Sequence, residues 1–256
     1  MRPFYFALCI DSSLGRLDYE SMSQQALMEM AVSRMSDCNL SLFKDKNGNF
    51  LDISEWDHVE LNKDGTVREV VWSSDEEIPD KPSGQGSILL EWLPDTIEEV
   101  WLIDRGFEGT LECAKIPRKI RDFYLNNNRL RGRIAVTDLP ACIERFAVPK
   151  NFLTGVLDLR NAPKSLMYFN AFQNQLHGSV ILDQANSIID LFIGSNLFEK
   201  IFPFENLPRN LAEFGSDSNL LTGTLDCSKL PRSLTRTIIM ENEFYGSLRL
   251  QDLPEK

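Results

Sequence analysis

Few residues of this sequence have the type and spacing that catalysis requires. The chain contains two histidines, His58 and His177, that lie far apart in the sequence, and no two cysteines are spaced as CxxC. A zinc site is therefore not expected. The sequence also lacks GxxxxGK[ST] and HExxH motifs, and its carboxylates are dispersed. We predict that the chain is not an enzyme and uses no metal or cofactor.

The residues whose chemistry recurs are suited to contact with another molecule. Aromatic, apolar and amide side chains return about every 23 residues between Trp101 and Met240. Aromatic anchors of this kind carry much of the binding energy in protein interfaces. The candidate contact residues are Trp101, Ile103, Tyr124, Asn126, Tyr168, Asn170, Phe172, Phe192, Ile238 and Met240.

A sequence repeat must position these residues. Its marker is a proline at Pro94, Pro117, Pro140, Pro163, Pro208, Pro231 and Pro254, with Ala185 in one place. An aliphatic residue follows three positions later and a second apolar residue six positions later, as in Ile120 and Phe123. This pattern predicts seven repeats over residues 94–253 and the start of a further repeat at 254.

Asparagine and glycine mark the bends of each unit. Asn stands eleven residues after the proline position in six of the seven units, and Gly follows four residues later in six of seven. An Asn at a bend both donates to and accepts from the backbones of adjacent turns, so stacked copies form a buried ladder. The predicted ladder residues are Asn128, Asn151, Asn174, Asn196, Asn219 and Asn242.

The repeat LxxFxLxxNxLxGxLDLxxLP resembles the leucine-rich repeat, close to its plant-type subclass. The resemblance implies an α/β solenoid with a curved parallel β-sheet and short strands or turns on the convex side. The preceding WxxVxxxxxGxVxxL spacing, from Trp56 to Val70, resembles the plant-type N-terminal cap without its cysteines.

The repeats and the cap give the expected domain organisation. We expect an N-terminal cap over residues 1–66, with a first strand at 3–10, a helix within 19–35 and a β-hairpin around Gly65. The leucine-rich repeats then occupy residues 67–256. They begin with a degenerate repeat, 67–93, interrupted by an acidic insertion at 73–86.

In a solenoid, the variable strand residues face the concave side. The candidate contact residues are thus expected there, beside a mostly charged column of Glu99, Asp122, Arg145, Tyr168, Asp190, Glu213 and Arg236. An apolar centre flanked by charge is typical of a protein interface. The alternative is that the aromatic residues favour strands and simply pack on one another.

Charge and cysteine usage restrict the partners and the location. The net charge is −11, and no basic stripe suits nucleic acid or a membrane surface; the cluster of Arg129, Arg131 and Arg133 is expected to be a solvated turn. No run is long enough for membrane insertion. The cysteine count is five, an odd number without paired spacing, which favours a reducing, cytoplasmic location over secretion. A sequon at Asn39 leaves the extracellular alternative open.

These observations lead us to expect a non-catalytic interaction or scaffold module that binds a protein partner on its concave face. An alternative is a structural subunit that docks, or self-associates, through an open edge after the last repeat and through the cap. A third interpretation is an extracellular ligand-binding ectodomain or a surface antigen.

Overall fold

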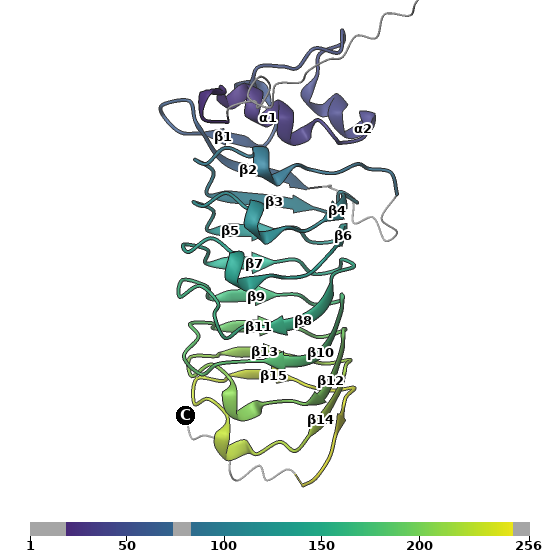
Figure 1. Ribbon diagram of the computed structural model, residues 1–256, viewed down its shortest axis with the longest axis vertical. Coiled ribbons are helices and arrows are strands. Elements are labelled where there is room, and N and C mark those ends of the chain that lie inside the picture. Colours follow the sequence, from purple (N-terminus) through teal and green to yellow (C-terminus); the bar gives the residue numbers. More distant parts are fainter. Residues whose placement is uncertain (1–18, 74–82, 248–256) are drawn as a thin grey trace, which may run out of the picture.

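The computed structural model describes residues 19–73 and 83–247, which form an elongated stack of repeating turns with the cap at one end (Figure 1). One wall is a nine-stranded sheet, in which only the first pair of strands is antiparallel. In spatial order its strands are β1 Val59–Leu61, β2 Val67–Ser73, β3 Glu99–Ile103, β5 Asp122–Tyr124, β7 Arg145–Ala147, β9 Tyr168–Asn170, β11 Asp190–Phe192, β13 Glu213–Gly215 and β15 Arg236–Ile238. The predicted α/β solenoid with a parallel sheet is confirmed.

A second, five-stranded parallel sheet forms a flank of the solenoid. Its strands are β8 Thr154–Asp158, β10 Gln175–Ile181, β12 Leu197–Ile201, β14 Leu220–Gly223 and β16 Glu243–Phe244. The pair β4 Glu108–Thr110 and β6 Arg129–Arg131 precedes it. We call the five-stranded sheet the flank sheet. Single turns of 3-10 helix complete many repeats: η4 Leu90–Trp92, η5 Cys113–Lys115, η6 Val136–Asp138, η7 Phe204–Asn206 and η8 Cys227–Lys229.

The apolar positions of the repeat fill the space between the walls. The residue six places after the proline position is apolar and buried from Val100 to Phe214, and three successive rings stack, with centroids 5.9 Å apart for Phe123 and Phe146 and 5.7 Å for Phe146 and Phe169. Because successive units place apolar side chains at the same height, one continuous core runs through the stack.

The asparagines form an internal ladder. Asn151 Nδ2 donates to the carbonyl oxygen of Leu125 in the preceding unit at 2.8 Å. It also donates to the carbonyl oxygens of Val148 and Pro149 in its own bend. Its Oδ1 accepts the backbone N–H of Leu130 at 3.1 Å. The same pattern of bonds to the preceding unit is made by Asn128, Asn174, Asn196, Asn219 and Asn242.

The residue before each ladder asparagine bends the chain. It has a positive φ in every unit, for instance 54° at Lys150 and 53° at Gln173. Its N–H is held by the following unit, as in the 2.8 Å bond from Lys150 to the carbonyl oxygen of Phe172. This bond and the ladder bonds together offset the cost of a left-handed residue that is not glycine.

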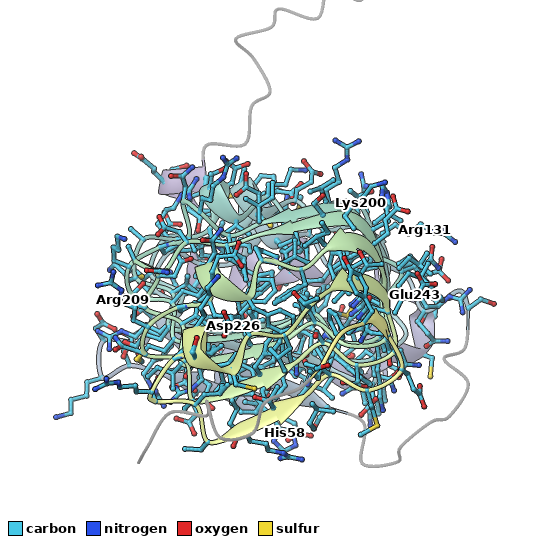
Figure 2. The ribbon with its side chains drawn as sticks, turned by 90° about the horizontal axis from the view of Figure 1, so that it is seen from below. His58, Arg131, Lys200, Arg209, Asp226 and Glu243 are labelled. Atoms are coloured by element: carbon cyan, nitrogen blue, oxygen red, sulfur yellow. The ribbon has the colours of Figure 1, made fainter. Side chains whose placement is uncertain are left out.

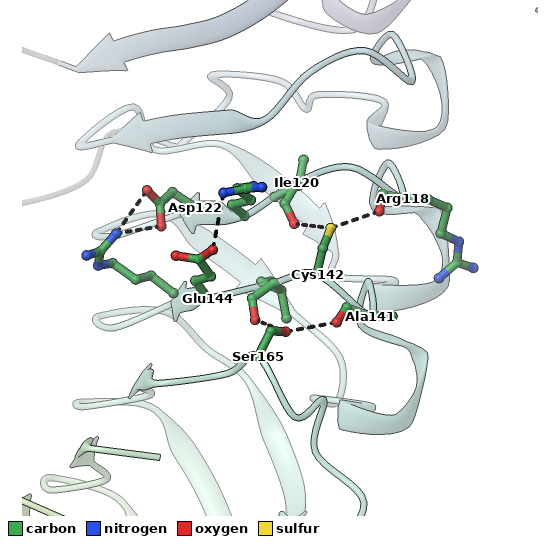
Figure 3. Close-up of polar contacts among 10 residues, drawn as sticks. Arg118, Ile120, Asp122, Ala141, Cys142, Glu144 and Ser165 are labelled. Atoms are coloured by element: carbon green, nitrogen blue, oxygen red, sulfur yellow. Dashed lines mark hydrogen bonds and ion pairs between the residues drawn. The ribbon is translucent and has the colours of Figure 1, made fainter. Parts of the chain in front are cut away.

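A second ladder stands two residues after the proline position (Figure 3). Ser165 Oγ donates to the carbonyl oxygens of Ala141 and Ile143 in the preceding unit, at 2.9 and 2.6 Å. Cys142 Sγ makes the same pair of contacts to Arg118 and Ile120, at 3.1 and 3.4 Å. Small hydroxyl and thiol side chains thus connect neighbouring turns at the edge of the main sheet.

The cap is packed directly on the first turns. It contains α1 Gln24–Val32 and α2 Asp37–Leu40, with single 3-10 turns η1 Tyr19–Ser21, η2 Ser41–Phe43 and η3 Ile53–Glu55. Ser23 caps α1 by accepting the N–H of Ala26. The rings of Phe43, Trp56 and Trp72 meet beneath the helices, with centroids 4.5 and 4.8 Å from Phe43. The antiparallel pair β1 and β2 places the cap hairpin in the main sheet.

Some expected features lie outside the described residues. These are the strand at 3–10, positions 74–82 of the acidic insertion and the start of a repeat at 254.

Replacing Asn151 by Ala tests the ladder. The substitution leaves the backbone groups of Leu125 and Leu130 without their buried partner, and we expect a loss of at least about 2 kcal/mol in the free energy of unfolding. Urea unfolding followed by circular dichroism measures it. Asn161→Ala, at an exposed position, is the matched control and should change stability by less than about 0.5 kcal/mol. Equal effects of the two variants would contradict the ladder's role.

Candidate functional site

The exposed face of the main sheet carries three parallel rows of side chains. The register aligns Asp122 with Arg145 and Tyr168, and it aligns Tyr124 with Ala147 and Asn170. Because alternate residues of a strand point to the same face, these rows and the row two residues later form one surface. The candidate contact residues and the charged column predicted from the sequence therefore share one face.

Four rings on this face touch in sequence and form what we call the aromatic run: Trp101, Tyr124, Tyr168 and Phe192. Trp101 and Tyr124 are stacked, with centroids 4.2 Å apart and planes 25° apart. The following centroid distances are 6.5 and 5.9 Å. Tyr124 reaches Tyr168 because Ala147, on the strand between them, is small and only 1% exposed. Each ring is half-buried by its neighbours.

Amide side chains stand beside the aromatic run. Asn170 Nδ2 donates to the Tyr168 hydroxyl at 3.1 Å, and its Oδ1 accepts the N–H of Phe172 at 2.9 Å. Within the described residues, Trp101 Nε1 and Asn126 Oδ1 are buried without a hydrogen-bond partner. A buried polar group without a partner carries a desolvation cost. Ile103, two residues after Trp101, is half-buried on the same face.

The charged column is only partly neutralised. Arg145 pairs with Asp122 at 3.1 Å, and Arg236 approaches Glu213 at 3.8 Å. Burial, followed by the neighbouring carboxylate of Glu213, raises the pKa of Asp190. Burial also raises the pKa of Tyr124 to about 12, so its phenol is neutral at physiological pH. The column presents both signs of charge beside the rings.

The last two candidates lie apart from the aromatic run. The register places Gly215 between Phe192 and Ile238, and the neighbouring row has Gly194. Met240, two residues beyond Ile238, is 65% exposed. The structure thus groups the N-terminal candidates into a contiguous surface and separates Ile238 and Met240 from it by a strip of glycine.

Sequence reasoning missed a second surface. Among the described residues, most of the strongly exposed large hydrophobic side chains lie along the flank sheet: Val156, Leu197, Ile201, Leu220 and Tyr245. These residues stand twelve, fourteen or sixteen places after the proline positions, so the sequence contains the pattern. Their exposure, however, depends on the flank sheet, which the repeat motif does not predict.

Other features of the described residues set limits on the chemistry. No group of three or more His, Cys, Asp or Glu side chains is placed to hold a metal ion. No helix in that part of the chain has the length and apolar character needed to cross a bilayer. A cavity of about 220 Å³ between the cap and the first repeat has an apolar floor that includes Leu90 and Leu111, and Glu91 and Lys115 pair at its rim.

Comparison with known proteins finds similarity at the level of structure. No known family and no curated protein matches the sequence. A pollen receptor kinase 3 has 17% sequence identity over 88% of this chain and 98% of its own, with a TM-score of 0.58. The leucine-rich-repeat ectodomain of the Arabidopsis receptor kinase HAESA, in complex with an extended IDA peptide hormone, has 19% identity and a TM-score of 0.51. That match covers 70% of this chain but only 30% of the HAESA chain.

A plant ice-binding protein is also similar, with 16% identity, 88% coverage of each chain and a TM-score of 0.50. At these identities the comparisons show the fold. The chain has the fold of plant-type leucine-rich-repeat proteins, as the sequence motif predicted.

The expected cytoplasmic location is wrong. The proteins of similar fold are receptor kinases, one of them described as an ectodomain with a peptide hormone ligand, and an ice-binding protein. They point to an extracellular rather than a cytoplasmic location.

The error lies in the interpretation of the cysteines. Cys113 and Cys227 are each 2% exposed and serve as small apolar core residues. Cys142 occupies the ladder position that Ser165 and Ser233 hold in other repeats. Their unpaired state therefore reflects packing and hydrogen bonding, and it carries no information about the redox state of the compartment.

Thiol labelling tests this assignment. We expect maleimide at pH 7.5 to modify the exposed Cys38 readily and to spare Cys113, whose burial raises its pKa to about 11 and so suppresses the reactive thiolate. Peptide mapping by mass spectrometry distinguishes the sites, and labelling in 8 M urea provides the unfolded reference, where Cys113 should react. Modification of Cys113 at the rate of Cys38 in the folded protein would contradict its place in the core.

Proposed function

We propose that this chain is a non-catalytic interaction module that binds a protein or peptide along the concave face of its main sheet. The observation that carries the proposal is the contiguous aromatic run beside a partly neutralised charged column. Half-buried rings in contact offer a wide apolar surface, and charged groups at its margin orient a partner.

The rigidity of the surface supports binding. Tyr124 and Tyr168 stand on strands whose spacing is set by the main-sheet register and by the asparagine ladder beneath. Little ordering entropy is then lost when a partner docks. The stacking of Trp101 on Tyr124 also fixes the orientation of both rings before binding.

The comparisons favour the extracellular form of this proposal. The HAESA structure that resembles this chain is described as an ectodomain in complex with a peptide hormone, and a second HAESA structure includes a co-receptor as well. We therefore infer that the partner is an extracellular protein or peptide, which corresponds to the ectodomain alternative considered for the sequence.

A triple variant tests the site. Trp101→Ala and Tyr124→Ala remove the stacked pair of the aromatic run, and Phe172→Ala removes a further candidate contact ring; all three side chains are only half-buried, so the variant leaves the core intact. The immobilised wild type should retain a protein that the triple variant loses. After that protein has been identified and purified, we expect its affinity for the triple variant to fall by at least about 100-fold.

A matched control lies on the flank sheet. Leu197→Ala, Leu220→Ala and Tyr245→Ala remove exposed side chains of similar size from the other surface and should leave the affinity for this partner unchanged. Circular dichroism and urea unfolding verify that both variants are folded. Retention of the same protein, with unchanged affinity, by the concave triple variant would overturn the proposal.

A further inference from the structure

A row of basic side chains lies along the edge of the main sheet at which its strands begin. Its members are exposed, and each stands one residue after the proline position of its repeat and four residues before a strand: Arg118, Lys164, Arg209 and Arg232. We call them the basic row. The second ladder holds its backbone, since Cys142 contacts the carbonyl oxygen of Arg118 and Ser233 contacts that of Arg209. Figure 3 shows Arg118 at this edge, beyond Cys142.

The charges of the basic row are not neutralised by carboxylates. Within the part of the chain that the structure describes, none of its members forms an ion pair. Lys164 Nζ donates to the carbonyl oxygen of Ala185 at 3.3 Å, and the Arg209 guanidinium donates to the side-chain oxygen of Gln184 at 3.2 Å. Arg118 likewise donates to two backbone carbonyl oxygens. These bonds orient the side chains and leave their positive charge available to a ligand.

The sequence did not predict the basic row, because its members lie one or two repeats apart in the chain and the net charge is −11. The solenoid brings them onto one edge. At about 4.8 Å per strand, the row is about 24 Å long.

An open groove of about 470 Å³ lies beside the basic row and crosses four repeats. It is lined by Lys164 of the basic row and by the apolar residues Met167 and Ile189, the second of which is 38% exposed. Glu144, at one end of the groove, pairs with Arg121 at 3.4 Å. The groove thus combines an apolar part with a cation that no carboxylate neutralises.

The second ladder is interrupted in this groove. Ser165 and Ser233 each donate to two carbonyl oxygens of the preceding unit. Ser187 and Asn210 hold the same position in the two units between them, but their side chains make no hydrogen bond to another described residue. Both line the groove. A hydroxyl and an amide are therefore available to a ligand beside the basic row.

We propose that the groove and the basic row together bind an acidic polysaccharide, whose sugar rings carry carboxylate or sulfate groups. The spacing of the charges favours this ligand. Lys164 lies two repeats from Arg118 and two from Arg209, about 10 Å in each direction. The units between them have the uncharged Ala141 and Asn186, the latter only 4% exposed. A disaccharide of an extended polysaccharide has about this length, so a chain with one acidic group in each disaccharide meets one cation per disaccharide.

The groove supplies the remaining contacts of a sugar chain. Ser187 and Asn210 exchange hydrogen bonds with ring hydroxyls, and Met167 and Ile189 pack against the C–H face of a sugar ring. The cations pair with the acidic groups, and salt weakens these pairs because they are exposed. A polyanion without hydroxyls, such as polyphosphate, would use the basic row alone. This inference goes beyond the proposed function and uses a different surface.

Fluorescence anisotropy of an end-labelled chondroitin sulfate hexasaccharide, titrated with the full chain at about 50 mM NaCl, tests the proposal. Lys164→Gln with Arg209→Gln should weaken binding by at least about tenfold, since two charged contacts are lost. Arg131→Gln with Lys200→Gln is the matched control and should change the affinity by less than about twofold. Figure 2 shows Arg131 and Lys200 on the side of the molecule opposite Arg209. Circular dichroism verifies that each variant is folded.

Ser187→Ala with Asn210→Ala tests the groove apart from the charges. This variant should bind the hexasaccharide at least about fivefold more weakly, because two hydrogen bonds to sugar hydroxyls are lost. Its affinity for a polyphosphate of equal charge should match that of the wild type. An unsulfated chondroitin hexasaccharide, which keeps one carboxylate in each disaccharide, separates the contribution of carboxylates from that of sulfates.

Three results would overturn the proposal. The first is a wild-type chain that binds neither hexasaccharide up to about 2 mM. The second is an unchanged affinity in the Lys164 and Arg209 variant. The third is an equal loss of hexasaccharide and polyphosphate binding in the Ser187 and Asn210 variant, since the groove would then not contact sugar. The triple variant of the aromatic surface retains the groove and the basic row, so failure of partner binding there leaves these readouts unchanged.

Discussion

The structure depends on pairing the backbone groups that each bend exposes to the interior. After each strand of the main sheet from β3 to β15 the chain turns through a left-handed residue, and the groups around that turn have no strand partner. Asn151 meets this need with both ends of its amide, and its bonds reach back to Leu125 and Leu130. One side chain thus satisfies the bend and ties it to the unit before, so no turn is stable alone.

The ladder also determines where the surfaces form. Since each bend holds its unit in register with the last, residues at equal positions of the repeat stand in straight rows on the main sheet. These rows bring Trp101 against Tyr124. Strands β12 and β14 of the flank sheet are instead offset by two residues, so that Glu199 pairs with Leu220. The glycines at the bend position of the repeat, such as Gly155 and Gly178, have a positive φ. Lys200, with φ of 78°, takes a glycine position and is strongly exposed.

Much of the fold was predictable because it is repetitive. The Asn at a fixed place, the buried ring at Phe123 and its equivalents, and the rows of the concave face all follow from one period. The period does not determine which side chains contact one another across the strands of the main sheet. Contact between Tyr124 and Tyr168 requires the small Ala147 between them, and the separation of Ile238 requires Gly215. The odd count of cysteines gave a wrong location, and the role of Cys142 as a serine equivalent is visible only from the carbonyl oxygens that its thiol contacts.

The two surfaces differ in how far their apolar side chains are covered in the absence of a partner. On the main sheet the rings cover one another, so the aromatic run is stable without a partner. On the flank sheet Leu197 and Ile201 are aliphatic, lie four residues apart on β12 and remain about half or more exposed. Neighbouring side chains on that sheet do not cover them, and the cost of their exposure falls only when another surface does so. A solenoid that presents both kinds of face is suited to two simultaneous contacts, one on each wall.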